Sequence, residues 1–365
     1  MNYKKVIKKL TPAFLLDFYY WFWALVGAVI FGFPSKKLIV IGVTGTSGKS
    51  TTVDFIARIF KEAGFKTASA SSIRFKIGEK EWKNELKMTM PGRFAIQRFL
   101  KKAADAGCKY VILEVTSEGI KQSRHKFIHF DTAVFTNLSP EHIESHGGFE
   151  NYRSEKLKLF RTVKNNHIIN IDDLSAKYFL NIPTKKILTF GIKNSADLTA
   201  EDVGGTSFTI NGTQFYLNLL GNFNVYNALA SVAVASLYGI SLDVCRKALE
   251  KVAGIPGRME IIAKEPILTV VDYAHTPEQL EKVYQSILNL KSEIANHKLI
   301  CVLGSCGGGR DKWKRPVLGR LAEKYCKEII ITNEDPYDEN PLSIMKEIEN
   351  GFSQMRNSYE ILDRR

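Results

Sequence analysis

The sequence predicts an α/β protein with a mainly parallel sheet flanked by helices. Short runs rich in valine and isoleucine, such as KLIVIGV at 37–43 and YVILE at 110–114, have the composition of buried parallel strands. The first run leads through a glycine-rich turn into a segment at 50–65 whose apolar residues recur at helical spacing. A chain of 365 residues with 45% hydrophobic and 24% charged residues can bury a core in two domains.

The charge balance points to an anionic partner. The chain carries 51 lysine and arginine residues against 38 aspartate and glutamate residues, a formal net charge of +13. Such an excess suits nucleotides, phosphorylated substrates or an anionic membrane face. No nucleic-acid partner is expected, because the basic residues form no stripe interleaved with aromatic residues. Five cysteines without a C-x-x-C pair favour a reducing cytoplasmic setting over a zinc or disulfide framework.

Residues 1–36 are expected to form a short N-terminal arm, apolar and helical with a basic start. The stretch MNYKKVIKKL precedes a nearly unbroken apolar run from Phe14 to Phe33, interrupted by Asp17. The run is long enough to span a bilayer, but the basic flank would then export the remainder of the chain. Two interpretations stay open: peripheral contact of residues 13–33 with the inner face of the membrane, or a helical arm packed on the main sheet.

The segment IGVTGTSGKSTT at 41–52 has the features of a phosphate-binding loop. It follows a predicted strand and precedes a predicted helix, so that backbone N–H groups and the helix N-terminus face an anion. Lys49 would neutralise phosphate charge, and the Ser50 hydroxyl would bind Mg²⁺. The common loop has a glycine five positions before Gly48, where this chain has Val43. The glycine spacing therefore distinguishes this loop from the common one.

The spacing G-x-x-G-T-x-G-K followed by two hydroxyl residues resembles the loop of the Mur ligases, the ATP-dependent amide-forming enzymes of peptidoglycan precursor synthesis. Further ordered motifs extend the resemblance from about residue 37 to the last residue, most closely to the ligases that add the third amino acid of the stem peptide. The resemblance implies that Lys49 is catalytic and that ATP is bound by Gly45, Thr46, Ser47, Gly48, Lys49, Ser50 and Thr51.

Two further segments imply a magnesium site. YVILEVTSEG at 110–119 resembles the family's E-V-S-S-H segment, whose glutamate, here Glu114, helps to hold the ion, although Glu118 replaces the usual histidine. In AVFTNLSPEHIESHGGFENYRSEKLKLF at 133–160, His142 matches a magnesium ligand, and Lys156 matches a catalytic lysine that the family carbamylates with CO₂. In-line phosphoryl transfer needs cations that bridge the phosphates. The implied magnesium ligands are Ser50, Glu114, His142 and Lys156.

Motifs in the second half imply further nucleotide contacts. The segment at 219–240 matches G-x-x-N-x-x-N-A, in which Asn224 and Asn227 lie on one helical face and could read the adenine edge. GIPGRMEII at 254–262 resembles the hinge before the C-terminal domain, and its Arg258 matches an ATP-contacting residue. TVVDYAHTPEQLEKV at 269–283 resembles the D-Y-A-H-x-P motif. There Asp272 would face the nucleotide, and His275 would act on the acyl phosphate as a catalytic residue.

Three segments imply contacts with the substrates. Thr89 in KMTMPG occupies the place of the family's T-T-P motif. CVLGSCGGGRDKWKRPVLG at 301–319 resembles G-x-G-G-x-R-D-x-x-K-R, a basic turn near the reacting groups. In it Arg310 is a catalytic residue, Asp311 and Lys314 contact the substrate, and Arg315 lies beside them. The expected substrate contacts in IIITNEDPYDENP at 329–341 are Glu334, Asp335 and Tyr337.

The last of these segments bears on which amino acid is added. Tyr337 stands where the family's D-N-P-R motif has an arginine that grips the distal carboxylate of meso-diaminopimelate. Tyrosine cannot form that bidentate charged contact. The acidic neighbours favour a side-chain ammonium, so a lysine-like amino acid is expected rather than meso-diaminopimelate. A solvated acidic turn with no role in specificity is the alternative.

The expected organisation is an arm at 1–36, a P-loop central domain at 37–255 and a smaller Rossmann-like C-terminal domain at 256–365. A β-hairpin with Asn-Gly at its turn is expected at 204–219. Compared with the family, the chain is expected to lack the N-terminal UDP-binding domain and to end early in the C-terminal domain. The acceptor is therefore expected to be a UDP-linked or lipid-linked muramoyl-peptide precursor.

The expected function is an ATP- and Mg²⁺-dependent, cytoplasmic ligase that joins an amino acid to this precursor through an acyl phosphate. Two alternatives remain. One is another ligase of the same superfamily, similar to folylpolyglutamate or cyanophycin synthetase. The other is a membrane-tethered nucleotide-binding module without ligase activity.

Overall fold

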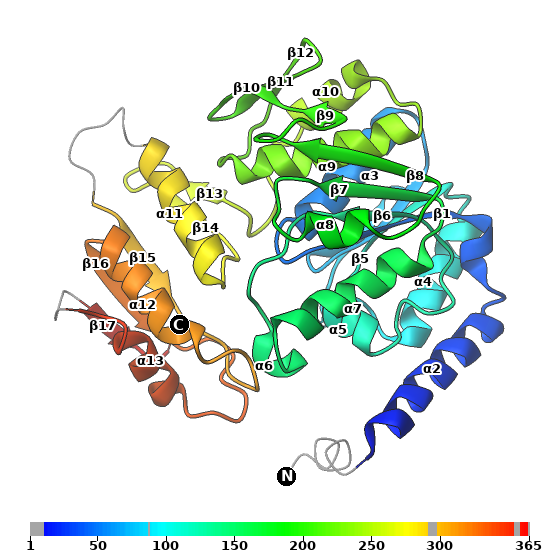
Figure 1. Ribbon diagram of the computed structural model, residues 1–365. Helices are drawn as coiled ribbons and strands as arrows, with labels where there is room; N and C mark the ends of the chain where they lie inside the picture. The colour runs from blue at the N-terminus through cyan, green and yellow to red at the C-terminus, as the bar shows by residue number, and fades with distance from the viewer. Residues whose placement is uncertain (1–10, 87, 291–297, 354–357, 364–365) are drawn as a thin grey trace. The chain divides into compact units, whose positions relative to one another are not determined.

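The computed structural model describes residues 11–86, 88–290, 298–353 and 358–363, and it divides into two compact units (Figure 1). The first unit comprises Met1–Leu138 and Arg153–Pro256. The second comprises Gly257–Arg365 together with Ser139–Tyr152, a segment from the middle of the chain. The domain boundaries expected from the sequence stay a prediction, but the α/β class with a large, mainly parallel sheet is confirmed.

A nine-stranded sheet forms the centre of the first unit's described residues, in the order β4-β3-β2-β5-β1-β6-β7-β8-β9. Strands β3 and β4 are antiparallel additions at one edge, and the other neighbouring strands pair in parallel. The strands are β1 (Ile39–Thr44), β2 (Thr67–Ala70), β3 (Arg74–Ile77), β4 (Lys80–Lys83), β5 (Tyr110–Glu114), β6 (Phe130–Phe135), β7 (Asn166–Asn170), β8 (Lys186–Gly191) and β9 (Leu198–Thr199).

Helices cover both faces of this sheet, which explains why its central strands are mainly apolar (Figure 1). Ile41 and Val43 of β1 belong to a core shared with α3, α9 and α10, whereas Gly42, which alternates with them, faces Leu159 of α7. The first unit's helices are α3 (Lys49–Glu62), α4 (Arg93–Asp105), α5 (Ser117–Lys121), most of α7 (Phe149–Thr162), α8 (Ala176–Leu180), α9 (Phe223–Leu237) and α10 (Leu242–Glu250).

The expected hairpin is present in the first unit. Strands β11 (Ser207–Ile210) and β12 (Thr213–Tyr216) pair antiparallel, and β10 (Glu201–Gly204) pairs with β11 on the other side. Asn211 and Gly212 at the turn both have positive φ, 46° and 75°, as a two-residue hairpin turn requires.

The N-terminal arm forms helix α2 (Ala13–Ile30), followed by a short 3-10 helix η1 (Pro34–Lys37). The main neighbour of α2 is helix α4 and not the sheet, so the expected packing on the sheet is wrong in that respect. Ala24 and Ala28 are buried, and Trp23 and Phe94 lie with ring centroids 5.6 Å apart. Among the described helices, none combines the length and apolar character needed to cross a bilayer.

The second unit contains a small parallel sheet in the order β15-β16-β17 and a separate antiparallel pair β13-β14. Leu303, Ile329 and Ile331 of the parallel sheet form a core with Leu318, Met345 and Ile348 from the helices. The elements are β13 (Glu260–Ala263), β14 (Thr269–Val271), β15 (Ile300–Leu303), β16 (Glu328–Thr332), β17 (Ser358–Ile361), α6 (Ile143–His146), α11 (Pro277–Leu290), α12 (Lys314–Tyr325) and α13 (Pro341–Glu349).

Candidate active site

The glycine-rich loop leaves the carboxyl end of β1 and enters α3 at Lys49, as the sequence predicts. Gly48 has φ of 78°, and a Cβ there would lie 2.1 Å from the Asn227 Oδ1 atom. A Cβ at Gly45 would lie 2.0 Å from the Thr136 Oγ1 atom. Only glycine fits these two positions, because neighbouring strands and helices already occupy the space of a side chain.

The end of strand β6 holds the loop in place. The Asn137 Oδ1 accepts a hydrogen bond from the Ser47 N–H at 2.9 Å, and the Asn137 carbonyl accepts one from the Thr46 N–H at 2.9 Å. Thr136 Oγ1 donates to the Ser47 carbonyl at 2.7 Å. Sequence reasoning did not single out Thr136 and Asn137, although both stand in the quoted F-T-N-L stretch. The parallel sheet brings them to the loop because adjacent parallel strands end at the same edge.

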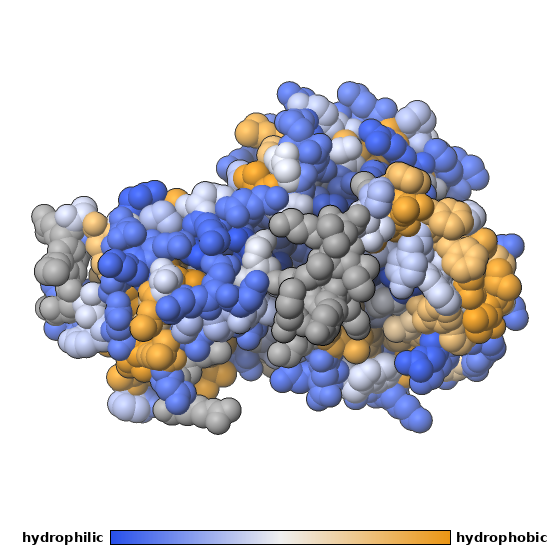
Figure 2. All heavy atoms as spheres, turned by 90° about the horizontal axis from the view of Figure 1, so that it is seen from below, coloured by the Kyte–Doolittle hydropathy of each residue, from blue (hydrophilic) through white to orange (hydrophobic). Residues whose placement is uncertain are grey.

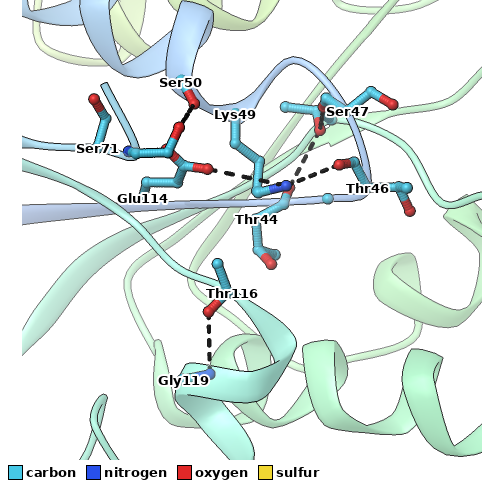
Figure 3. Close-up of polar contacts among 12 residues, drawn as sticks. Thr44, Thr46, Ser47, Lys49, Ser50, Ser71, Glu114, Thr116 and Gly119 are labelled. Carbon is cyan, nitrogen blue, oxygen red and sulfur yellow. Dashed lines mark hydrogen bonds and ion pairs between the residues drawn. The ribbon is translucent and has the colours of Figure 1, made fainter. Parts of the chain in front are cut away.

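Lys49, Ser50 and Glu114 meet at this edge of the sheet (Figure 3). The Lys49 Nζ donates to the Thr46 carbonyl at 2.8 Å and lies 4.0 Å from the Glu114 Oε1. The Ser50 Oγ donates to the Glu114 Oε2 at 2.7 Å, and the Ser72 N–H donates to the same oxygen at 2.9 Å. A cation, a hydroxyl group and a carboxylate thus converge beside the N-terminus of α3.

This donor set fits a magnesium ion. Hydroxyl and carboxylate oxygens are hard ligands of the kind that Mg²⁺ prefers, and the ion usually takes few protein ligands besides phosphate oxygens and water. Ser50 and Glu114 supply such oxygens side by side. No group of three or more His, Cys, Asp or Glu side chains suited to a metal occurs within residues 11–86, 88–290, 298–353 and 358–363.

Lys156 lies against the same loop from α7. Its side chain is buried, and its Nζ donates to the Gly45 carbonyl at 2.7 Å. An unmodified ammonium only donates hydrogen bonds and cannot bind a metal ion. The predicted role of Lys156 as a metal ligand would need the carbamate, which carries oxygen atoms in place of the ammonium charge.

Asn224 and Asn227 come to the loop from helix α9, and both are buried. The Asn227 Nδ2 donates to the Asn224 Oδ1 at 3.0 Å, and the Asn224 Nδ2 donates to the Leu220 carbonyl at 2.8 Å. Asn227 also packs on Gly48, as described above. The contact of Asn227 with Gly48 places this asparagine pair beside the phosphate loop. Contact of the pair with adenine stays a prediction.

In the second unit, the buried carboxylate of Glu141 lies beside His142 and His275, two histidines for which the sequence predicts functional roles. The Glu141 Oε1 lies 2.6 Å from the His275 Nε2 and 3.7 Å from the His142 Nε2. The His275 Nδ1 lies 2.9 Å from the Tyr273 carbonyl. Burial by itself would raise the pKa of Glu141, but His275, His142 and Lys314 lower that pKa well below its ordinary value. Sequence reasoning missed Glu141, which sits next to the predicted ligand His142.

Arg258 and Asp272, the residues of this unit that are predicted to contact the nucleotide, lie close together. The Arg258 guanidinium is 4.6 Å from the centre of the Tyr273 ring. Asp272 accepts hydrogen bonds from the Met259 and Ala274 N–H groups, each at 2.7 Å. Burial raises the pKa of Asp272 above its ordinary value. The hydrogen bond from the Met259 N–H thus places Asp272 close to Arg258.

The basic turn divides into exposed and buried residues. Arg310 is exposed, whereas Asp311 is buried and accepts hydrogen bonds from the Ile143 and Glu144 N–H groups at 3.2 and 2.9 Å. Lys314 is buried as well. Arg315, expected near the reacting groups, is fully buried and pairs with Glu339 and Glu347 at 3.0 and 2.8 Å. These two carboxylates and the Cys306 carbonyl hold the guanidinium, and its nearness to the reacting groups stays a prediction.

The predicted substrate residues fall into both units. Tyr337 is exposed, has φ of 54° and lies against Gly308, and Asp335 beside it is also exposed while Glu334 is half-buried. Thr89 belongs to the first unit and is half-buried. Their contacts with substrate stay predictions.

A pair of arginines near Thr89 was not anticipated. The Arg124 Nη1 donates to the Met90 carbonyl, and the Arg93 Nε donates to the Gln122 carbonyl at 2.9 Å. Burial lowers the pKa of both guanidinium groups, and the like charge of Arg124 lowers the pKa of Arg93 further. Arg124 thus contacts the residue that follows Thr89, in the segment where the sequence expects the acceptor.

Strand, glycine loop, helix and a carboxylate at the sheet edge define a P-loop nucleotide-binding protein of the α/β class. The Mur ligase middle domain matches residues 43–235, and the Mur ligase glutamate ligase domain matches residues 257–365. The chain belongs to the Mur ligase family, and it is an ATP-dependent ligase that forms amide bonds.

Similar proteins include two enzymes that match most of the chain. UDP-N-acetylmuramoyl-L-alanyl-D-glutamate--2,6-diaminopimelate ligase of Syntrophomonas wolfei is 38% identical over 357 residues, covering 94% of this chain and 72% of the relative. UDP-N-acetylmuramyl-tripeptide synthetase of a Roseiflexus species is 35% identical over 356 residues, covering 90% and 68%. A solved structure of a UDP-N-acetylmuramoyl-L-alanyl-D-glutamate--2,6-diaminopimelate ligase aligns with a TM-score of 0.62 at 30% identity, covering 90% and 68%.

Proposed function

We propose that the protein joins an amino acid to a muramoyl-peptide precursor of peptidoglycan, as the names of its relatives state for them. The observation that carries the proposal is the convergence of Lys49, Ser50, Glu114 and Lys156 on one loop. A substrate carboxylate attacks the γ-phosphate of ATP and yields ADP and an acyl phosphate. The amine of the incoming amino acid then attacks the acyl carbon, which forms the amide and releases phosphate.

Residues of the loop perform the first part of this reaction. Backbone N–H groups at the start of α3 and the Lys49 ammonium stabilise negative charge on the transferring phosphoryl group. Ser50 and Glu114 would hold Mg²⁺, which would supply positive charge to neutralise the phosphate oxygens. Carbamylated Lys156 would supply a further carboxylate-like ligand beside Gly45. His142, His275 and Arg310 are the proposed contributions of the second unit to the metal and the acyl phosphate.

The amino acid is proposed to be lysine-like. Tyr337 offers no cation for a distal carboxylate, and Glu334, Asp335 and Asp338 provide a negative field in which a side-chain ammonium is favoured. Because the relative from Syntrophomonas wolfei is named for 2,6-diaminopimelate, that amino acid is the competing outcome of the test. We further propose a location at the inner face of the membrane, with residues 13–33 as the contact.

The experiment measures ADP and phosphate release with UDP-linked muramoyl-dipeptide and, separately, a lipid-linked form as acceptor. Each is combined with lysine, meso-diaminopimelate, ornithine or alanine. Release that requires both an acceptor and lysine or ornithine supports the proposal, and dependence on diaminopimelate alone would refute the specificity. Dependence of the rate on bicarbonate, with the matching mass increase on Lys156, tests the carbamate. Absence of release with every pair would contradict the proposed acceptor.

A further inference from the structure

Helix α2 carries its large apolar side chains on the outside. Side chains that stay exposed include Phe14 at 70%, Phe18 at 62% and Ile30 at 62%. Aromatic residues Tyr19, Trp21, Phe22 and Trp23 are exposed as well. Figure 2 shows apolar side chains gathered over the edge of the molecule that α2 forms. An apolar patch of this kind marks an interaction surface.

The protein-facing side of the same helix is made of small residues. Ala24, Gly27 and Ala28 are buried, and a Cβ at Gly27 would lie 3.4 Å from the Arg93 carbonyl of α4. Because these residues are small, helices α2 and α4 can approach closely, as helices in lipid do where small residues lie between them. A helix facing water has the reverse arrangement, with large apolar side chains inward and polar ones outward.

The neighbouring helix α4 provides that contrast within the same molecule. It buries Ile96, Phe99 and Leu100 and exposes Lys101 and Lys102. Over the 18 residues of α2, the charged side chain is Asp17 alone. The two helices share one fold and one interface, so the difference indicates that the outer face of α2 does not meet water when the protein works.

We propose that the outer face of α2 docks on an anionic lipid bilayer, with its aromatic side chains in the headgroup boundary. Tryptophan and tyrosine suit that boundary because each has an apolar ring and a polar group. Lysines flank the helix on both sides in the sequence, Lys8 and Lys9 before it and Lys36 and Lys37 after it. Each lysine close to an anionic surface raises the partition constant roughly fivefold.

Charge also distinguishes a bilayer from a second copy of the chain. A two-fold contact through α2 would bring the flanking lysines of both copies together, and like charges at an interface oppose association. Anionic headgroups attract the same lysines. This inference deepens the proposed membrane contact by naming its partner. It rests on that part of the proposed function and not on ligase activity, because lipid binding is measured without ATP or acceptor.

The experiment uses the full chain with vesicles of phosphatidylcholine alone or mixed with phosphatidylglycerol. The test variant is Phe14→Ser/Phe18→Ser/Phe22→Ser, which changes one line of exposed side chains on α2. The matched control is Leu174→Ser/Tyr216→Ser/Leu342→Ser, three exposed apolar residues elsewhere. We expect the wild type and control to sediment with the mixed vesicles and the test variant to bind more than about tenfold more weakly. Lys36→Glu/Lys37→Glu should reduce the preference for phosphatidylglycerol.

Three outcomes would overturn the inference. One is wild-type protein that does not bind mixed vesicles. Another is a test variant that binds them as well as the control does. The third is light scattering that shows a lipid-free dimer which the test variant abolishes, because the face would then join two copies. ADP release measured on the same variants separates this result from the ligase proposal.

Discussion

The two units position their charged residues in different ways. In the first unit, Glu114 ends strand β5, where it pairs with Val43 of β1, and Lys49 and Ser50 begin helix α3 just after β1. In the second unit, Glu141 and Asp311 are held by contacts between a segment at 139–152 and loops beyond residue 257. The first site is built on sheet hydrogen bonds, and the second is built on ion pairs and caps between loops.

This difference predicts how each site responds to substitution. A side chain at a strand end or helix start keeps its place when a partner is substituted. Such a substitution is therefore expected to lower activity without lowering stability. A charged side chain held by other charged side chains loses its position with its partner, so structure and activity change together. Substitutions at four residues test that contrast, and the expected effects decrease in the order Lys49, Arg315, Glu141 and Glu339.

Replacing Lys49 by alanine should abolish turnover without unfolding the protein. The ammonium stabilises charge on the transferring phosphoryl group, and its loss is expected to lower kcat by about a thousandfold or more. Lys158→Ala, a substitution of an exposed lysine on α7 that pairs with Glu155, is the control and should leave ADP release unchanged. Normal turnover in the Lys49 variant would contradict the assignment of this loop to the active site.

Replacing Arg315 by methionine should lower the free energy of unfolding by about 3 kcal/mol. The side chain is fully buried, and its loss leaves Glu339 and Glu347 without their shared cation. Lys324→Met removes an exposed partner of Glu281 and should lower the free energy of unfolding far less, because solvent screens that pair. Urea unfolding of both variants measures the contrast, and equal costs would contradict the structural role of Arg315.

Replacing Glu141 by glutamine should lower kcat by about 10- to 100-fold, by analogy with the partners that orient metal-bound histidines. We expect Glu141 to act as a positioning residue through its contact with His275. Glu141→Asp keeps the charge and should restore part of the rate, and KM for ATP should change less than kcat. If the glutamine and aspartate variants lose stability and activity in parallel, Glu141 serves folding alone.

Glu339 should make stability depend on pH in the acid range. Arg315 lowers the pKa of this carboxyl from 4.5 to about 2 in the folded protein. Because the folded-state pKa is the lower one, the carboxylate stabilises the fold above about pH 4.5, and this is lost as the pH falls toward 2. The contribution is about 1 kcal/mol after allowance for solvent screening. The stability difference between wild type and Glu339→Gln should narrow between pH 6 and pH 3, and a constant difference would refute the linkage.

Much of the fold and of the first site was predictable from the sequence. Strand β1, the loop and helix α3 are contiguous, so valine-rich composition, glycine spacing and helical periodicity each report on the same local structure. Glu114 was placed correctly at a strand end for the same reason. The residues missed, Asn137 and Glu141, are polar side chains whose partners lie far away in the sequence, at Ser47 and His275.

The sequence by itself determined the α/β class, the phosphate loop and the family, because these depend on local patterns and ordered motifs. The tertiary structure decided which side chains those motifs bring together. It placed Arg315 in a buried ion-pair network and packed α2 on α4 with its small residues inward. Neither outcome could be read from composition, because the same apolar or charged residue can face a core, a partner or solvent. Long-range packing alone selects among these environments.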